Sequence, residues 1–391
     1  MDKIDELLTR GVENIYPSRQ ALEKVLRSGR KLRMYQGFDP SMPSLHLGNY
    51  VGLLKMKQFQ DLGHEVIFLV GDFTGRIGDP TDKLATRKML SSQETKKNSQ
   101  SYQEQAAKIL NFSGTNPVKM KFNSDWNDKL SFKGLIEICA NFTVQQMIER
   151  DMFQERLKAG KPIHLHEFLY PVAQGYDSVF MEVDLELGGS DQTFNMLAGR
   201  TLLKALKDKE KFVLTTKLLV DARGEKVGKT TGNALFLDRP ANEFYGGLMA
   251  FPDEVLPLGF ELLTQVPIGE VDSLDFSGNP MELKKRLAFE VVKIIYGEKA
   301  AREAQTNFEK VFQKRQSPEN LKEVEVTNKN WETNRLLLKT GLVKSLSEAK
   351  RLLAQKAIEL NGTIVTERNL ALGEGDILRV GKTRFVRIKV L

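Results

Sequence analysis

Residues 35–49 combine residue types that could bind a phosphate group. An apolar run with β character, residues 32–38, breaks into a turn rich in Pro and Ser, and a helical pattern then begins. His46, Gly48 and Asn49 therefore lie where a strand has ended and a helix starts, a point where backbone N–H groups and the helix dipole attract phosphate. Gly48 allows close approach of a ligand, and His46 and Asn49, three residues apart, share a helix face. The alternative is an ordinary strand-to-helix turn with a polar cap.

A second candidate phosphate site is the loop 226–230, Lys-Val-Gly-Lys-Thr. Lys226 and Lys229 carry ammonium groups on a loop bounded by glycine. Such a loop can close on a triphosphate and neutralise the charge that develops during its reaction. The residue order differs from the Walker A pattern G-x-x-x-x-G-K-[ST]. The alternative for two lysines in a loop is a solvated surface.

Three further polar residues have the spacing of one helix face. Tyr170, Gln174 and Asp177 stand at i, i+4 and i+7, so a helix over 170–179 presents an aromatic ring, an amide and a carboxylate together. Such a wall suits a ligand that carries an ammonium or a phenol rather than an apolar side chain. The alternative is an amphipathic helix with a polar outer face.

Asp79 and Gln192 occur in glycine-containing turns that follow strand-like or apolar segments. In an open parallel sheet such turns gather at the carboxyl ends of the strands, above the ligand crevice. The pattern 32–38 strand, 46–62 helix and 66–70 strand is a βαβ unit. We therefore predict an α/β fold with a parallel sheet.

The composition is typical of a globular protein, and its positive charge is distributed unevenly along the chain. The chain has 391 residues, a net charge of +7 and one cysteine, Cys139, which excludes an internal disulfide and a Cys-based metal site and favours a reducing compartment. Residues 331–391 contain twelve Lys and Arg against six Asp and Glu, a surplus of +6, so the rest of the chain is nearly neutral. The N-terminus lacks the apolar segment of a secretory signal, and no run is long enough to span a membrane. A basic module on a neutral body indicates a polyanionic partner.

The remaining sequence patterns complete the predicted order of elements. We expect a helical lead-in over 1–30, a polar helical stretch over 84–110 that follows Lys83 and carries Arg87, an insertion over 112–170, a helix over 193–206 and a strand over 212–220. His164 and His166 form an H-x-H pair, which without a nearby cysteine we interpret as ordinary polar residues rather than a metal site.

The chain becomes rich in helix after residue 240 and then polar over 314–330, which is typical of a linker. In the basic module, Ser345 caps a helix, and Asn361-Gly362 predicts a type I′ hairpin turn. A basic helix joined to a small β unit fits folded RNA, recognised by its shape and its phosphates. An inert basic domain is the alternative.

Taken together, these residues resemble a bacterial tyrosyl-tRNA synthetase of class I over nearly the whole chain. His46-Leu47-Gly48-Asn49 stands at the place of the H-I-G-H element, and Lys226-Val227-Gly228-Lys229-Thr230 at the place of K-M-S-K-S. Asn49 departs from the last His of H-I-G-H, and the second motif lacks Met and Ser but keeps both lysines. Residues 342–391 resemble an S4-type RNA-binding domain.

The resemblance implies a set of site residues, a reaction and partners. It implies that ATP, with Mg²⁺, activates L-tyrosine to tyrosyl-adenylate, that tyrosine is then transferred to the 3′ end of tRNA(Tyr), and that the protein is a cytoplasmic homodimer. The tyrosine pocket would contain Tyr35, Asp79, Tyr170, Gln174, Asp177 and Gln192. The ATP site would contain Gly37, Asp39, His46, Gly48, Asn49, Gly189, Asp191, Lys226 and Lys229, with Lys83 and Arg87 assisting catalysis.

The implied architecture is a Rossmann-like catalytic domain (1–233, with the 112–170 insertion at the dimer interface), an all-α domain that binds the anticodon arm (234–313), a linker (314–330) and a small α+β S4-like domain (331–391). A tryptophanyl-tRNA synthetase would share the fold, although Tyr35 and Asp177 suit a phenol. A small-molecule adenylyltransferase would not need the basic module. A non-catalytic RNA-binding protein would not need the two lysines.

Overall fold

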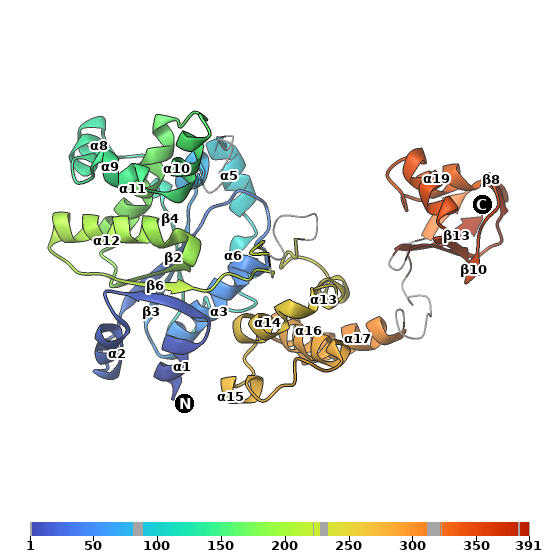
Figure 1. The fold of residues 1–391 in the computed structure, drawn as a ribbon, viewed down its shortest axis with the longest axis horizontal. Coiled ribbons are helices and arrows are strands. Elements are labelled where there is room, and N and C mark those ends of the chain that lie inside the picture. The colour runs from blue at the N-terminus through green and yellow to red at the C-terminus, as the bar shows by residue number, and fades with distance from the viewer. Residues whose placement is uncertain are drawn as a thin grey trace. The chain divides into compact units, whose positions relative to one another are not determined.

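The computed structural model describes residues 2–80, 89–221, 223–226, 234–310, 321, 323–381 and 384–390. The chain forms two compact units, residues 1–301 and 302–391 (Figure 1). We predicted a separate helical domain over 234–313, and residues 234–301 of that range group with the sheet in the first unit. Within the described ranges, no helix combines the length and the apolar character needed to cross a membrane.

The first unit is built on a six-stranded sheet of order β1-β6-β5-β2-β3-β4. Its strands are β1 (Val12–Tyr16), β2 (Arg33–Phe38), β3 (Glu65–Val70), β4 (Lys119–Phe122), β5 (Leu185–Gly189) and β6 (Phe212–Thr216). All neighbours pair in parallel except β1 and β6. The α/β prediction is therefore confirmed, and β3, which is buried on both faces, has the continuous apolar run expected of a central parallel strand.

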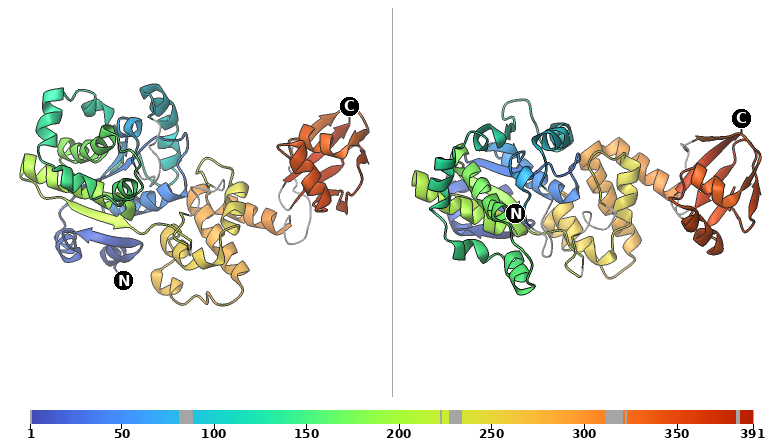
Figure 2. Two further views of the ribbon diagram at one scale, coloured as in Figure 1. Left: turned by 45° about the horizontal axis from the view of Figure 1, so that its top comes forward. Right: turned by 90° about the horizontal axis from the view of Figure 1, so that it is seen from above.

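Helices pack on both faces of the sheet (Figures 1 and 2). Helix α3 (Leu47–Asp61) connects β2 to β3 and packs on β2, β3 and β5, whereas α12 (Thr193–Lys207) connects β5 to β6 and packs on those two strands and on α11 (Leu165–Met181). The two crossovers run in opposite directions along the sheet, so right-handed connections place their helices on opposite faces. The direction changes between β2 and β5, which opens a crevice at their carboxyl ends.

Four details differ from the sequence prediction. The 1–30 lead-in contains β1 between α1 (Lys3–Thr9) and α2 (Arg19–Arg27), and the glycine turn at 187–189 is the end of β5. The 112–170 segment includes β4, which pairs with β3, so the sheet resumes before residue 170. Within the described part of 84–110, the helix divides into α5 (Ser92–Ser99) and α6 (Tyr102–Ala106). Each strand missed is short, and its pairing partner lies far away in sequence.

Short helices complete the sheet-bearing part of this unit. After β3 and β4 come α4 (Thr74–Ile77) and α7 (Ser124–Asn127), and the following residues form α8 (Phe132–Cys139), α9 (Val144–Ile148) and α10 (Asp151–Lys158). The apolar sides of α8, α9, α11 and α12 share one core cluster, which includes Ile138, Met147, Val172 and Leu202. The segment predicted as an insertion is therefore a layer packed against α11 and α12.

The helical part of the unit is fastened to the N-terminus by buried cations. Its helices are α13 (Ala241–Met249), α14 (Leu256–Leu263), α15 (Ile268–Val271), α16 (Pro280–Tyr296) and α17 (Glu298–Phe308). The Arg10 guanidinium donates to the carbonyls of Phe260 (2.8 Å) and Glu261 (2.9 Å) at the end of α14. The last carbonyls of a helix have no partner within it, so these bonds join α14 to α1.

The second unit is a small α+β domain with its own core. Its main sheet has the order β10-β9-β12-β13-β7, and β11 pairs with β8. The elements are β7 (Glu323–Val326), β8 (Asn330–Glu332), α18 (Thr333–Lys339), α19 (Leu346–Ala354), β9 (Ile358–Leu360), β10 (Thr363–Ile364), β11 (Asn369–Ala371), β12 (Ile377–Val380) and β13 (Arg384–Val390). Strand β7 lies within the 314–330 segment predicted as a linker and pairs with β13. The core includes Leu336, Leu352, Ile358, Leu378 and Val386.

Two local predictions in the second unit are confirmed. The Ser345 side chain accepts from the backbone N–H of Glu348 at 3.1 Å and caps α19. Asn361 and Gly362 both have positive φ, 50° and 84°, as the two-residue turn between β9 and β10 requires.

Lys55 gives the first unit a testable dependence on pH. Its ammonium is buried and donates to the carbonyls of Leu7 (2.9 Å) and Arg10 (2.7 Å), and burial lowers its pKa from 10.5 to about 7. Between these two values the unfolded chain holds a proton that the folded chain has lost, so stability rises with pH and is lost as pH falls towards 7. The Lys55→Met variant lacks this term, so the unfolding free energy of the parent minus that of the variant should rise by up to about 1.4 kcal/mol per pH unit.

The measurement is urea unfolding at pH 7, 8 and 9 in a Trp331→Phe background, because Trp126 is then the sole tryptophan and reports on the first unit. A difference that stays constant across these pH values would show that Lys55 keeps its proton in the folded state.

Candidate active site

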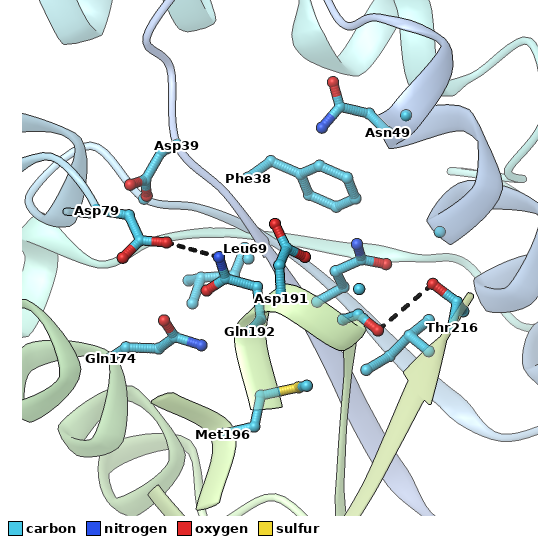
Figure 3. A pocket seen from close by; sticks show the side chains of 18 of the residues that line it. Phe38, Asp39, Asn49, Leu69, Asp79, Gln174, Asp191, Gln192, Met196 and Thr216 are labelled. Atoms are coloured by element: carbon cyan, nitrogen blue, oxygen red, sulfur yellow. Dashed lines mark hydrogen bonds between the residues drawn. The ribbon is translucent and has the colours of Figure 1, made fainter. Parts of the chain in front are cut away.

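A cavity of about 240 Å³ lies at the carboxyl ends of the central strands, beside the start of α3. It brings together every predicted site residue that the structure describes: Tyr35, Gly37, Asp39, His46, Gly48, Asn49, Asp79, Tyr170, Gln174, Asp177, Gly189, Asp191, Gln192 and Lys226. Figure 3 shows the side chains from β2, α3, α11 and the β5–α12 turn converging on one space. Lys83, Arg87 and Lys229 lie outside the described residues.

The part of the cavity that we predicted to bind phosphate is the capped start of α3. The His46 Nδ1 atom accepts from the Gly48 backbone N–H at 3.0 Å, and the Asn49 Oδ1 atom accepts from the His46 backbone N–H at 3.0 Å. This capping box explains how asparagine serves in the last position of the motif, because its amide supplies the acceptor. Since Nδ1 accepts, a neutral His46 carries its hydrogen on Nε2, and Asn49 keeps its NH₂ group as a donor.

The lysine loop reaches the same cavity through Lys226. Its Nζ atom lies 2.5 Å from the Asp191 Oδ2 atom in the turn after β5, and Val220 and Lys226 form an isolated β-bridge. The pair places one cation in the lining of the cavity. At Gly37 a Cβ atom would project into open space, so this position of β2 leaves room for a ligand beside the backbone.

At another part of the cavity, Asp177 is a buried carboxylate surrounded by donors. Its Oδ1 atom accepts from the Trp126 indole N–H (2.8 Å) and the Asn127 amide (3.1 Å), and its Oδ2 atom accepts from the Asn123 amide (3.1 Å). Burial raises the pKa of Asp177 to about 8, while the three donors act in the opposite direction. A carboxyl group held this way can recognise a single hydroxyl or ammonium group.

On α11, Gln174 lies one turn and Tyr170 two turns before Asp177, and the two side chains bind different partners. The Tyr170 hydroxyl donates to the Asp39 Oδ2 atom at 2.8 Å, and the Gln174 amide donates to Glu186 at 2.9 Å. Burial, with the nearby Asp39 and Asp79 carboxylates, raises the pKa of Tyr170, so its hydroxyl stays neutral. The predicted common face of the helix is therefore confirmed in space.

Asp79 is already engaged by two side chains. The Arg150 guanidinium donates to its Oδ1 atom at 3.1 Å, and the Gln192 amide donates to its Oδ2 atom at 2.6 Å, the bond drawn in Figure 3. Arg150 and Asp79 are both buried, so each neutralises the other where solvent does not. A carboxylate has about four acceptor positions, so Asp79 retains capacity for a ligand cation.

Sequence patterns missed the residues that hold the predicted ones in place. These supporting residues are Asn123, Trp126, Asn127, Arg150, Ser178, Glu186 and Lys211. The polar residues around Trp126, directly after β4, could have indicated a site, but they fall within the segment 112–170 that we predicted as an insertion.

His164 caps α11, where its backbone N–H donates to Glu167 at 2.9 Å. No group of three metal-ligating side chains occurs among the described residues.

Comparison with known proteins assigns both units. The family described as tRNA synthetases class I (W and Y) matches residues 27–313, and the S4 domain family matches residues 334–378. The tyrosine--tRNA ligase of Geobacter sulfurreducens is 42% identical over 395 residues, covering 98% of this chain and 97% of that protein, and the tyrosine--tRNA ligase of Thermotoga maritima is 39% identical, covering 98% and 96%.

Solved structures agree on the fold of the larger unit. The truncated mitochondrial tyrosyl-tRNA synthetase of Aspergillus nidulans has a TM-score of 0.68 at 23% identity, covering 79% of this chain and 94% of that one. The Archaeoglobus fulgidus tyrosyl-tRNA synthetase, described as complexed with L-tyrosine, has a TM-score of 0.59 at 18% identity, covering 78% and 100%.

Proposed function

The chain belongs to the tyrosine--tRNA ligases of class I, and from that premise we propose how its residues divide the reaction. In the first step an oxygen of the tyrosine carboxylate attacks the α-phosphorus of ATP, the bond to the bridging oxygen breaks, and pyrophosphate leaves with its electron pair. In the second step a ribose hydroxyl at the 3′ end of tRNA(Tyr) displaces AMP from the adenylate. No protein nucleophile is needed, so the protein acts by positioning its substrates and stabilising charge.

The observation that carries this proposal is the buried carboxyl group of Asp177 in the same cavity as the capped start of α3. Asp177 and Tyr35 hold the phenol of tyrosine, and Tyr170, Gln174, Asp79 and Gln192 surround its ammonium, which needs acceptors. A side chain without a hydroxyl leaves buried polar groups of this wall unpaired, which is a strong basis for rejection. Tyrosyl-tRNA synthetases, which reject phenylalanine, are themselves the established example of this effect.

ATP occupies the other half of the cavity. Gly37, Asp39, Gly48, Gly189 and Asp191 accommodate the nucleotide, and His46, Asn49, Lys226 and Lys229 donate to its phosphates and stabilise the charge that develops on pyrophosphate. Lys83 and Arg87 assist. Mg²⁺ arrives with ATP, since it binds substrate phosphates in preference to a cage of protein groups.

Lys226 supplies a physical link between nucleotide binding and the lysine loop. Its ion pair with Asp191 is partly exposed to solvent, so it is weak. Ribose hydroxyls that donate to Asp191 compete with Lys226, which is then available to the phosphates.

The rest of the chain binds tRNA and, we propose, a second copy. Residues 250–313 take the anticodon arm, and the S4 unit takes the long variable arm through its +6 surplus of charge over residues 331–391. We propose that the enzyme is cytoplasmic, because a chain with a single cysteine, and so without an internal disulfide, suits a reducing compartment.

The exposed apolar side chains of the 112–170 segment support a dimer. They include Phe132 (79% exposed), Ile136 (55%), Val144 (71%) and, at the start of α11, Leu165 (84%). They come from α8, α9 and the start of α11, whose inner sides share one core cluster. Several large apolar side chains exposed on helices that share one core cluster are typical of an interface between protein chains.

The proposed reaction is tested by pyrophosphate exchange with ATP, run with each of the twenty amino acids. Exchange should depend on L-tyrosine and be negligible with L-phenylalanine. Exchange driven by tryptophan or by any other amino acid, or none at all, would refute the proposal.

The assignment of Asp177 predicts a selective loss. In Asp177→Ala, kcat/KM for tyrosine in the exchange reaction should fall by about a hundredfold or more, because leaving the buried phenol hydroxyl without its partner costs up to about 3 kcal/mol. The Kd of ATP should change by less than about threefold. Asp208→Ala, at a carboxylate that is 90% exposed, is the control. Equal losses of tyrosine activation and ATP binding would mean that Asp177 does not form the tyrosine wall.

The dimer predicts a change in mass. Light scattering should give the parent twice the chain mass of 44.3 kDa, whereas Phe132→Asp/Leu165→Asp should give a single chain mass, because a buried unpaired charge opposes association. Leu346→Asp, at an exposed leucine of the S4 unit, is the control and should keep the parent mass. An unchanged mass for the double variant would place the interface elsewhere.

A further inference from the structure

Behind the tyrosine wall lies a buried polar cluster, which we call the relay: Ser178, Glu186 and Lys211. Ser178 lies on α11, Glu186 on β5 and Lys211 directly before β6, and each is at most 1% exposed. No motif indicated them, and the reaction proposed above does not use them. Burying an ion pair in an apolar core costs desolvation energy, so its presence calls for a physical account.

The relay connects two residues that line the cavity. The Lys211 ammonium donates to Glu186 and, at 2.8 Å, to the Ser178 hydroxyl. The Ser178 oxygen lies 3.2 Å from the Glu186 Oε2 atom and 3.0 Å from the Tyr35 hydroxyl. The other Glu186 oxygen accepts from the Gln174 amide at 2.9 Å. Glu186 is therefore one step from Gln174 and two from Tyr35.

Counting hydrogens gives the relay a direction. An ammonium only donates, a carboxylate only accepts, and a serine hydroxyl has one hydrogen and two acceptor positions. Ser178 therefore accepts from Lys211 and gives its hydrogen to Glu186, which leaves one acceptor position for Tyr35. The Tyr35 hydroxyl donates to Ser178, so its own hydrogen points away from the cavity and its lone pairs face the ligand.

We propose that Glu186 and Lys211, through Ser178, are positioning residues that orient the Tyr35 hydroxyl as an acceptor for the substrate phenol. Through the hydrogen bond between Glu186 and the Gln174 amide, the same pair also positions Gln174. The inference rests on the proposed function, because it assigns a purpose to residues behind its tyrosine pocket. It adds a specificity device to that pocket.

The backbone of α12 is shaped to admit the relay. At Gly199 a Cβ atom would lie 2.7 Å from the Lys211 Nζ atom, 3.1 Å from the Ser178 Oγ atom and 3.3 Å from the Glu186 Oε2 atom. Because all three groups are buried, none can swing into solvent to make room. Glycine is less favourable than alanine in a helix interior, and here it gives the relay its space.

The direction of the relay also complements Asp177. If Tyr35 accepts the single phenolic hydrogen, the phenol oxygen needs a donor from its other neighbour. The raised pKa of Asp177 favours its protonated form, which supplies that donor. Hydrogen bonds then run in one sense from Asp177 through the substrate to Tyr35, Ser178 and Glu186.

The test is a double-mutant cycle between Ser178→Ala and Tyr35→Phe, read by pyrophosphate exchange with tyrosine and with phenylalanine. Ser178→Ala should raise the KM of tyrosine and lower the tyrosine-to-phenylalanine selectivity by about tenfold, with the KM of ATP unchanged, because it removes the hydroxyl that accepts from Tyr35 and links it to Glu186 and Lys211. In the Tyr35→Phe background, the same change should shift tyrosine KM by less than about twofold. Equal shifts in both backgrounds, or none in either, would overturn the proposal.

A second variant tests the ion pair without leaving a lone buried charge. Glu186→Gln/Lys211→Met removes both charges, and it should lower selectivity at least as much as Ser178→Ala while the KM of ATP is kept. Parent-like selectivity in this double variant would overturn the proposal. Ser99→Ala is the matched control, since Ser99 is a buried serine whose hydroxyl donates to the Lys96 carbonyl. Failure of the parent itself to exchange with tyrosine would instead refute the proposed function.

Discussion

A carboxyl group in the core of an α/β domain must be given hydrogen-bond partners, and in this protein that requirement centres on Asp177. Unpaired, a buried charge would cost several kcal/mol. Asn123, Trp126 and Asn127 supply the donors, and all three follow β4 at the edge of the sheet. Pairing of β4 with β3 therefore does more than extend the sheet, because it places these three donors beside Asp177.

The order of strands determines where the cavity opens. The crossovers from β2 and from β5 run in opposite directions along the sheet, and the crevice between these strands is bordered by the capped start of α3, by α11 and by the turn after β5. The positive end of the α3 dipole, the Asn49 amide and Lys226 are features of the cavity lining that suit phosphate. Buried side chains of α11 and the relay make the other part suited to a polar amino acid. One cavity thus presents two chemically different environments.

Outside the cavity, the polar groups that are buried act as fasteners. Arg10 and Lys55 satisfy backbone carbonyls at the ends of α1 and α14, which joins the helical residues 234–301 to the sheet. The S4 unit has its own apolar core. The helical residues are thus joined to the sheet in one unit, and the S4 domain is the other unit. The sequence pattern had also predicted a domain boundary at residue 233.

The sequence by itself determined the local features: the βαβ start, the cap at His46, the common face of Tyr170, Gln174 and Asp177, and the Asn361-Gly362 turn. Each depends on residues a few positions apart, so spacing and cap chemistry are sufficient to predict it. It did not reveal β1, β4 or β5, because short strands are defined by partners distant in the chain. Tertiary structure alone decided which polar residues meet, namely Asp79 with Arg150, Asp177 with Trp126, and Glu186 with Lys211. A buried charge leaves no local pattern, since its partner is chosen by the packing that excludes water from both.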